Sequence, residues 1–185
     1  MPRFILPSLI ACALSVPTLA AEPENTLHME VSSGGRVVIE LLPELAPGHV
    51  ARAKQLSRAG FYDGVVFHRV IEGFMAQTGD PTGTGTGGSE EPDLKAEFSD
   101  YPYRRGTLGA ARTQDPDSAN SQFFICFTDE GCSFLTGQYT VYGQVIEGME
   151  YIDKVAKGEP PTKPDRIVKM TVAADAAKAT EKDAD

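Results

Sequence analysis

Basic residues and metal-binding side chains are scarce in this chain. Its 185 residues include 17 Lys and Arg against 26 Asp and Glu, which gives a net charge of −9. Because binding to nucleic acid or to anionic lipid requires clustered cations, this balance argues against both partners. The three histidines, His28, His49 and His68, have no acidic or cysteine partner at metal-ligand spacing, so no metal site is expected.

Signatures of nucleophilic and cofactor chemistry are also lacking. The chain has no Gly-x-Ser-x-Gly elbow and no cysteine beside the basic residues that would activate a thiolate. The run Gly83–Gly88 contains Gly-x-Gly-x-x-Gly, but Ser89-Glu90-Glu91-Pro92 follows it instead of an apolar helix. Two carboxylates and a proline would stand where a dinucleotide phosphate needs a helix N-terminus. We therefore expect no cofactor.

Residues 1–20 have the pattern of an export signal. One basic residue precedes a short apolar run and small residues follow, which predicts cleavage after Ala20 or Ala21 and a periplasmic location. A spanning helix needs about 17–25 apolar residues, and the run is shorter and interrupted at Pro7, so no stable membrane insertion is expected. Lipid attachment through Cys12 is a less favoured alternative.

The remaining chain is expected to form one domain, residues 21–173, followed by a charged, disordered tail at 174–185. The 18 glycines and 13 prolines of the full sequence favour short elements joined by turns over a helical bundle. Helices are predicted to begin at Pro47 and at Met149. The fold class is mainly β, a closed eight-stranded antiparallel barrel capped by two α-helices. The predicted strands are 27–31, 36–42, 65–70, 74–78, 107–112, 122–127, 141–145 and 167–173.

The segment Phe67–Asp80, FHRVIEGFMAQTGD, combines aromatic, cationic and amide side chains in two predicted strands. Period-two alternation places Arg69 on one face with Phe67 and Ile71. An arginine on an otherwise apolar face is unusual. The residues alone are also compatible with a structural ion pair, or with an arginine stem packed on the barrel and its head in water.

In order along the chain, these motifs resemble the cyclophilin family of peptidyl-prolyl isomerases. The resemblance spans about residues 27–173, and its parts are Phe67–Asp80, Gly85–Gly88, Gly106–Gly109, Ser121–Ile125 and Gly143–Met149. It implies an eight-stranded barrel with two helices and an isomerase that needs no metal or cofactor. The implied substrates are proline-containing, unfolded or partly folded exported polypeptides. We expect a monomer.

The resemblance also implies a site. Arg69 matches the catalytic arginine, and an apolar pocket is expected to hold the proline ring. Arg112, Phe134 and Tyr139 replace an asparagine, a tryptophan and a histidine of the best-known eukaryotic pattern. Phe134 lacks an indole N–H donor, which implies weak binding of cyclosporin. The expected substrate-binding residues are His68, Phe74, Met75, Gln77, Ala111, Arg112, Gln122, Phe124, Phe134, Leu135 and Tyr139.

Two questions stay open at this point. Cys126 and Cys132 lie six positions apart with Gly131 between them, and either form a disulfide after export or remain free. The second question is whether the pocket catalyses isomerisation or only binds. The alternative to an enzyme is a non-catalytic chaperone or binding module of the cell envelope that holds proline-containing segments.

Overall fold

The first hairpin shows how the sequence pattern builds the sheet. In the computed structural model, which describes residues 21–175, β1 (Thr26–Val31) pairs antiparallel with β2 (Gly35–Leu41). Leu27 lies opposite Ile39, and both side chains are buried. Because successive side chains of a strand point to opposite faces, each strand turns its apolar residues toward the core. The predicted export signal lies outside the described residues.

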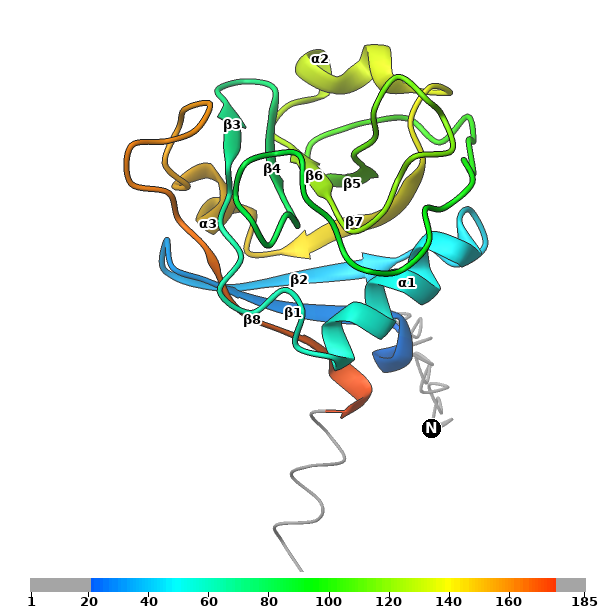
Figure 1. Ribbon diagram of the computed structural model, residues 1–185, viewed down its shortest axis with the longest axis horizontal. Helices are drawn as coiled ribbons and strands as arrows, with labels where there is room; N and C mark the ends of the chain where they lie inside the picture. The colour runs from blue at the N-terminus through cyan, green and yellow to red at the C-terminus, as the bar shows by residue number, and fades with distance from the viewer. Residues whose placement is uncertain (1–20, 176–185) are drawn as a thin grey trace, which may run out of the picture.

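Eight strands form one sheet in the order β3-β4-β6-β5-β7-β2-β1-β8, and every neighbouring pair is antiparallel (Figure 1). All eight predicted strands are present, most of them shorter than predicted. The other bounds are β3 (Arg69–Ile71), β4 (Met75–Thr78), β5 (Thr107–Ala110), β6 (Phe123–Cys126), β7 (Val141–Glu147) and β8 (Ile167–Val172).

The two edge strands, β3 and β8, are not joined by a regular ladder. The strand predicted over 65–70 becomes regular only at Arg69. Before that point the chain meets the start of β8 through an isolated bridge between Val66 and Arg166 and irregular hydrogen bonds, such as Gly64 N–H to the Ile167 carbonyl at 2.7 Å. The sheet is a curled half-barrel, so the prediction of a closed barrel is not confirmed.

Three labelled α-helices and two 3-10 turns flank the sheet in the described part of the chain, and residues 173–175 after β8 are also helical. Helix α1 (Pro47–Arg58) begins at the predicted proline and packs against β8 and β7, and α3 (Met149–Asp153) lies near β2. The sequence did not predict α2 (Asp129–Cys132), whose first turn is capped by the Thr128 hydroxyl accepting from Gly131 N–H at 3.0 Å. Within residues 21–175 no helix has the length and apolar character needed to cross a bilayer.

The 3-10 turns are Pro23–Asn25, before β1, and Ser133–Leu135, directly after α2. Buried side chains divide into a large cluster between α1 and the sheet and a smaller cluster under α2. A disulfide joins Cys126 at the end of β6 to Cys132 at the end of α2, with Cα atoms 6.1 Å apart, inside the smaller cluster. This crosslink fixes α2 and the following turn against the sheet.

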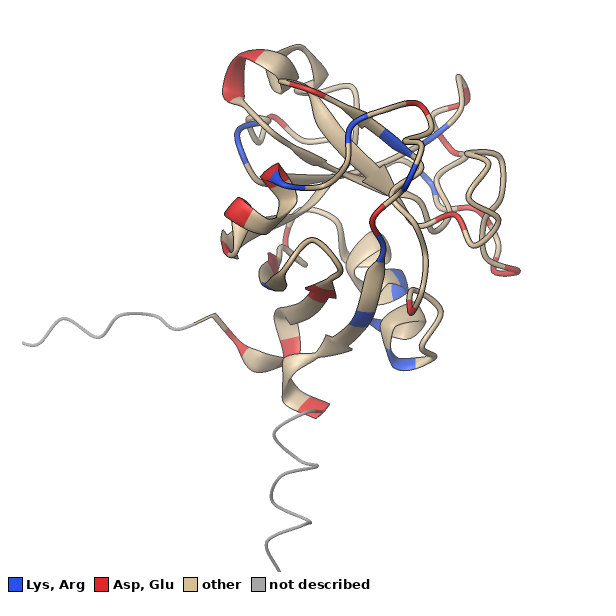
Figure 2. Cartoon of the chain, turned by 90° about the vertical axis from the view of Figure 1, so that its left-hand side faces the viewer, with Lys and Arg blue, Asp and Glu red and all other residues tan. Residues whose placement is uncertain are grey.

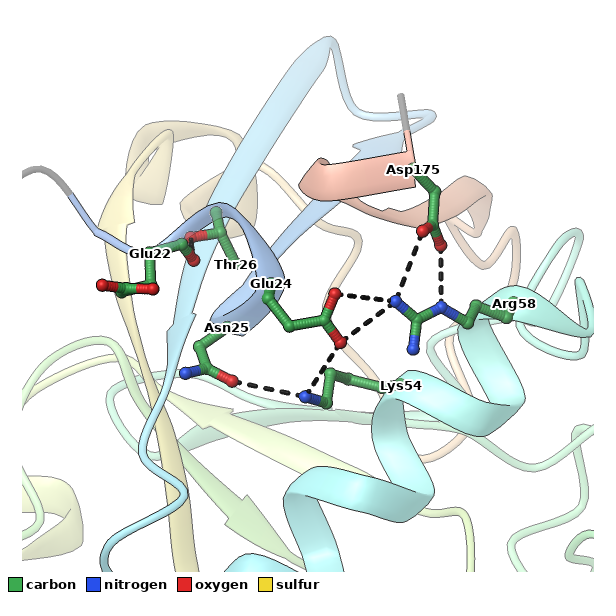
Figure 3. Close-up of polar contacts among 7 residues, drawn as sticks. All are labelled: Glu22, Glu24, Asn25, Thr26, Lys54, Arg58 and Asp175. Atoms are coloured by element: carbon green, nitrogen blue, oxygen red, sulfur yellow. Dashed lines mark hydrogen bonds and ion pairs between the residues drawn. The ribbon is translucent and has the colours of Figure 1, made fainter. Parts of the chain in front are cut away.

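The two ends of the described chain meet on α1, as Figure 3 shows. Arg58 binds Glu24 near the N-terminal end (2.9 Å) and Asp175 near the C-terminal end (2.8 Å), and Lys54 also contacts Glu24. Ala174 packs against the core. The first two residues of the predicted disordered tail are therefore ordered, because they have partners on the domain. Residues 176–185 lie outside the described residues.

Charged residues are dispersed over this domain. In the view of Figure 2, the Lys and Arg residues of the described chain are interspersed with Asp and Glu and do not gather into one basic face.

Candidate active site

Three adjacent strands place the candidate catalytic side chains in one row. Arg69 on β3 pairs with Gln77 on β4, and Gln77 pairs with Phe124 on β6. Directly opposed residues of an antiparallel ladder project to the same face. Met75, two residues before Gln77, shares that face and is buried. The register of the three strands therefore places Arg69, Gln77 and Phe124 together.

These side chains border a cavity of about 110 Å³. Nine of the predicted site residues line it, and the aromatic rings set its shape. Phe124 stacks on Tyr103 with ring centroids 5.7 Å apart and meets Tyr139 edge-on at 5.9 Å. The lining consists of Arg69, Phe74, Met75, Gln77, Ala111, Arg112, Phe124, Leu135 and Tyr139.

The other three predicted site residues lie around this cavity. Phe134 contacts Phe74 with ring centroids 5.6 Å apart, and its side chain is 60% exposed at the rim. Gln122 lines a larger adjoining cavity of about 440 Å³, which shares Gln77, Ala111 and Arg112 with the smaller one. His68 is buried below the site, and burial lowers its pKa below the ordinary 6.5, so it is neutral at pH 7.

A chain of side-chain hydrogen bonds crosses the floor of the site. Gln122 donates to the carbonyls of Gly85 (3.0 Å) and Gly87 (2.8 Å), which leaves its oxygen to accept from Gln77 Nε2 at 2.9 Å. Gln77 therefore turns its own oxygen toward Arg69 Nη1, 3.5 Å away. The chain of donors sets the orientation of both amides and presents an acceptor to the guanidinium.

The strongest partner of Arg69 is not among the residues predicted from the sequence. Glu159, 90 positions along the chain, accepts from Arg69 Nε at 2.7 Å. The local sequence around it, Gly158-Glu159-Pro160, contains no pattern that connects it to β3. The side chains of Arg69 and Glu159 are 41% and 52% exposed, so the pair lies at the mouth of the site rather than in the core.

Arg112 also lines the cavity and is held by backbone oxygens. Its Nη1 donates to the Thr113 carbonyl at 2.8 Å and its Nη2 to the Gln138 carbonyl at 3.0 Å. The guanidinium carbon lies 4.4 Å from the centre of the Tyr139 ring, within the range of a cation–π contact. Arg112 is therefore held in place by its neighbours, and Arg69 is the second cation of the lining.

A second residue absent from the sequence prediction, Asp80, shapes the loop beside the larger cavity. Its buried carboxylate accepts from the backbone N–H groups of Thr82 (2.8 Å), Gly85 (2.6 Å) and Gly87 (3.1 Å). Burial alone would raise the pKa of Asp80, but these hydrogen bonds and one from the Thr82 hydroxyl lower it from 3.8 to about 2. A Cβ on Gly87 would overlap the Asp80 carboxylate and the Thr82 side chain, so glycine is required there.

The described residues hold no group of three or more His, Cys, Asp or Glu side chains placed to bind a metal ion. The chemistry that the arrangement offers is a permanently charged hydrogen-bond donor beside a small cavity lined by aromatic and aliphatic side chains together with Gln77 and Arg112. Such a site can hold a compact ring and stabilise an acceptor that develops on it.

Comparison with known proteins assigns the chain. Residues 26–172 match the family described as "Cyclophilin type peptidyl-prolyl cis-trans isomerase/CLD". The chain belongs to this family. It is a peptidyl-prolyl cis-trans isomerase of the cyclophilin type, which decides the open question in favour of an enzyme.

Relatives of the isomerase span most of its length. A probable peptidyl-prolyl cis-trans isomerase of Brucella suis is 53% identical over 172 residues, covering 84% of this chain and 86% of that protein. Peptidyl-prolyl cis-trans isomerase B of Bacillus subtilis is 40% identical over 136 residues, covering 73% and 93%.

Solved structures show the same fold. The cyclophilin AquaCyp293 from Hirschia baltica is similar, with a TM-score of 0.76 and 29% identity over 84% of this chain and 76% of that one. A cyclophilin-type isomerase of Cryptosporidium parvum, crystallised in the presence of the dipeptide Ala-Pro, has a TM-score of 0.73 and 29% identity, covering 80% and 98%.

Proposed function

We propose that this isomerase accelerates rotation about X-Pro bonds without a covalent step, through Arg69 and the apolar cavity beside it. One observation carries the proposal: a guanidinium that donates to Glu159 lies on the wall of a cavity of about 110 Å³ that is also lined by the apolar side chains of Phe74, Met75, Phe124 and Leu135. That cavity suits a ring as small as that of proline.

The reaction requires only that the twisted peptide bond be favoured. Resonance between nitrogen and carbonyl resists rotation by about 18–20 kcal/mol, whereas the cis and trans forms of X-Pro differ by only about 0.5–1 kcal/mol. In the twisted state the prolyl nitrogen loses resonance and becomes a hydrogen-bond acceptor. An acceleration of about 10⁶ corresponds to a barrier lower by about 8 kcal/mol. A donor that binds the nitrogen only in the twisted state stabilises the transition state and not the ground state, and therefore raises the rate.

Each part of the site has a role in this scheme. The rings of Phe74 and Phe124, with Met75 and Leu135, hold the proline ring while the preceding carbonyl rotates. Arg69 donates to the prolyl nitrogen and stays charged across the physiological pH range. Gln77 orients Arg69 and the substrate carbonyl. The similar Cryptosporidium parvum structure obtained with Ala-Pro is consistent with a site for this dipeptide class in the family.

Replacing Arg69 with Ala tests the proposal. We expect kcat/KM for an uncharged X-Pro peptide to fall by about 100-fold or more, the usual effect of removing one transition-state donor. The melting temperature should change little, because the ion pair with Glu159 is exposed. Arg36→Ala is the control, since Arg36 forms a similarly exposed pair with Glu30 far from the site. Near-normal isomerisation by the Arg69→Ala variant would refute the role of Arg69.

The cellular setting is part of the same proposal. The export pattern in residues 1–20 supports a periplasmic enzyme that acts, as a monomer, on exported polypeptides during folding. Fractionation of cells that express the full chain or a chain lacking residues 2–20 tests the location. Retention of both proteins in the cytoplasm would contradict it.

A further inference from the structure

Glu159 lies across from Arg69 through a short stretch of backbone pairing. Val70 and Gly158 exchange two hydrogen bonds, Val70 N–H to Gly158 O at 2.8 Å and Gly158 N–H to Val70 O at 2.9 Å, in an antiparallel bridge. In such a bridge the residue before one partner opposes the residue after the other. Arg69 therefore has a cross-strand neighbour on each side, Gln77 on β4 and Glu159 on the loop before β8.

The backbone of the loop that carries Glu159 has little conformational freedom. Gly158 has φ of +145°, and a Cβ there would lie 2.7 Å from the Cα of Pro161. Pro160 and Pro161 follow directly, and each fixes its own φ and limits the residue before it. The carboxylate is thus presented from a stiff turn bonded to the strand that holds Arg69.

This contact occupies one defined position on the guanidinium. Arginine has five N–H donors in one plane. Glu159 takes the Nε donor at 2.7 Å, and Gln77 Oε1 lies 3.5 Å from Nη1. Two acceptors at two points of a planar group restrict its rotation, and the other Nη donors remain for a substrate in the cavity that Arg69 lines.

We infer that Glu159 is a positioning residue of the isomerase, which holds Arg69 by its Nε so that the Nη groups are directed at the substrate. The inference rests on the proposed role of Arg69. Misplacement of a catalytic group by about 1 Å can cost as much as 100-fold in rate, so an anchor of this kind affects turnover even where it adds little stability.

The contact between Glu159 and Arg69 is also compatible with inhibition of the enzyme, and kinetic measurements distinguish inhibition from positioning. A carboxylate bound to the guanidinium could instead compete with substrate for it. Competition predicts that removing Glu159 lowers KM or raises the rate, whereas positioning predicts that kcat falls.

The test compares Glu159→Ala and Glu159→Gln, with kcat and KM measured by NMR exchange on an uncharged X-Pro peptide. We expect Glu159→Ala to lower kcat about fivefold to tenfold with KM within about twofold. Glu159→Gln should recover kcat to within about twofold of wild type, because the amide oxygen still accepts from Nε. The control is Glu30→Ala, which removes an equally short pair, Arg36 Nε to Glu30 at 2.6 Å, and should leave kcat unchanged.

A double-mutant cycle separates the inference from the proposed function. In an Arg69→Ala background, Glu159→Ala should have no further effect on kcat. The positioning role is overturned if Glu159→Ala leaves kcat within about 1.5-fold, raises it, acts through KM alone, or acts equally without Arg69. If Arg69→Ala itself keeps near-normal activity, the proposed function fails and the inference fails with it.

Discussion

Asp80→Asn is the sharpest test of how the loop beside the site is held. Asp80 Oδ1 accepts from the Thr82 N–H and hydroxyl, and Oδ2 accepts from the N–H groups of Gly85 and Gly87. Asparagine keeps one oxygen and replaces the other with a donor. Whichever way the amide turns, at least one backbone N–H faces an NH₂ group and loses its partner.

The pKa of Asp80 indicates the size of the effect. A fall from 3.8 to about 2 corresponds to about 2 kcal/mol in favour of the charged carboxylate. This energy already includes the hydrogen bonds from the backbone N–H groups, since they are what lowers the pKa. Asp80→Asn should therefore destabilise the domain by about 2 kcal/mol at pH 7. For a domain of this size that is about 4–8 °C in melting temperature.

Thermal and urea unfolding measure the change, with Asp100→Asn, an exposed aspartate, as the control. Because the folded-state pKa lies below the ordinary value, the stabilisation is complete above about pH 3.8 and is lost as pH falls toward 2. The difference between wild type and Asp80→Asn should therefore shrink in that window. A melting temperature within 1 °C of wild type at pH 7, or a difference that persists unchanged at pH 2, would refute the reasoning.

Two further predictions concern the disulfide and the start of α1. Replacing both Cys126 and Cys132 with Ala should lower the free energy of unfolding by about 2 kcal/mol, the value for a short closed loop. Urea unfolding with and without reductant measures the change. An unchanged midpoint for the reduced wild type would contradict the prediction. The Glu97 carboxylate accepts hydrogen bonds at the start of α1 from Gly48 N–H (3.0 Å), His49 N–H (3.0 Å) and His49 Nδ1 (2.6 Å). Glu97→Gln should therefore lower the free energy of unfolding by about 1–2 kcal/mol. A change below about 0.3 kcal/mol in urea unfolding would count against this capping role.

Local pattern predicted the elements of this fold well. The hairpin β1–β2 and the start of α1 at Pro47 follow from alternation and from the fixed φ of proline, which act over a few residues. Short-range rules failed where a segment depends on its partner. Residues 65–68 alternate like a strand but run beside β8 without a ladder, and α2 depends on Thr128 and the disulfide.

The sequence by itself therefore determined the alternation of the first strands, the start of α1 and the motifs that resemble one family, and that resemblance pointed to Arg69 as the candidate catalytic residue. Only the tertiary structure decided what holds that arginine. Glu159 reaches it across 90 positions of sequence because Gly158 bridges Val70. In the same way, the loop behind Gln122 takes its shape from the carboxylate of Asp80. These contacts depend on how the curled sheet brings distant loops together, and a hydrogen bond between residues far apart in sequence leaves no periodicity to read.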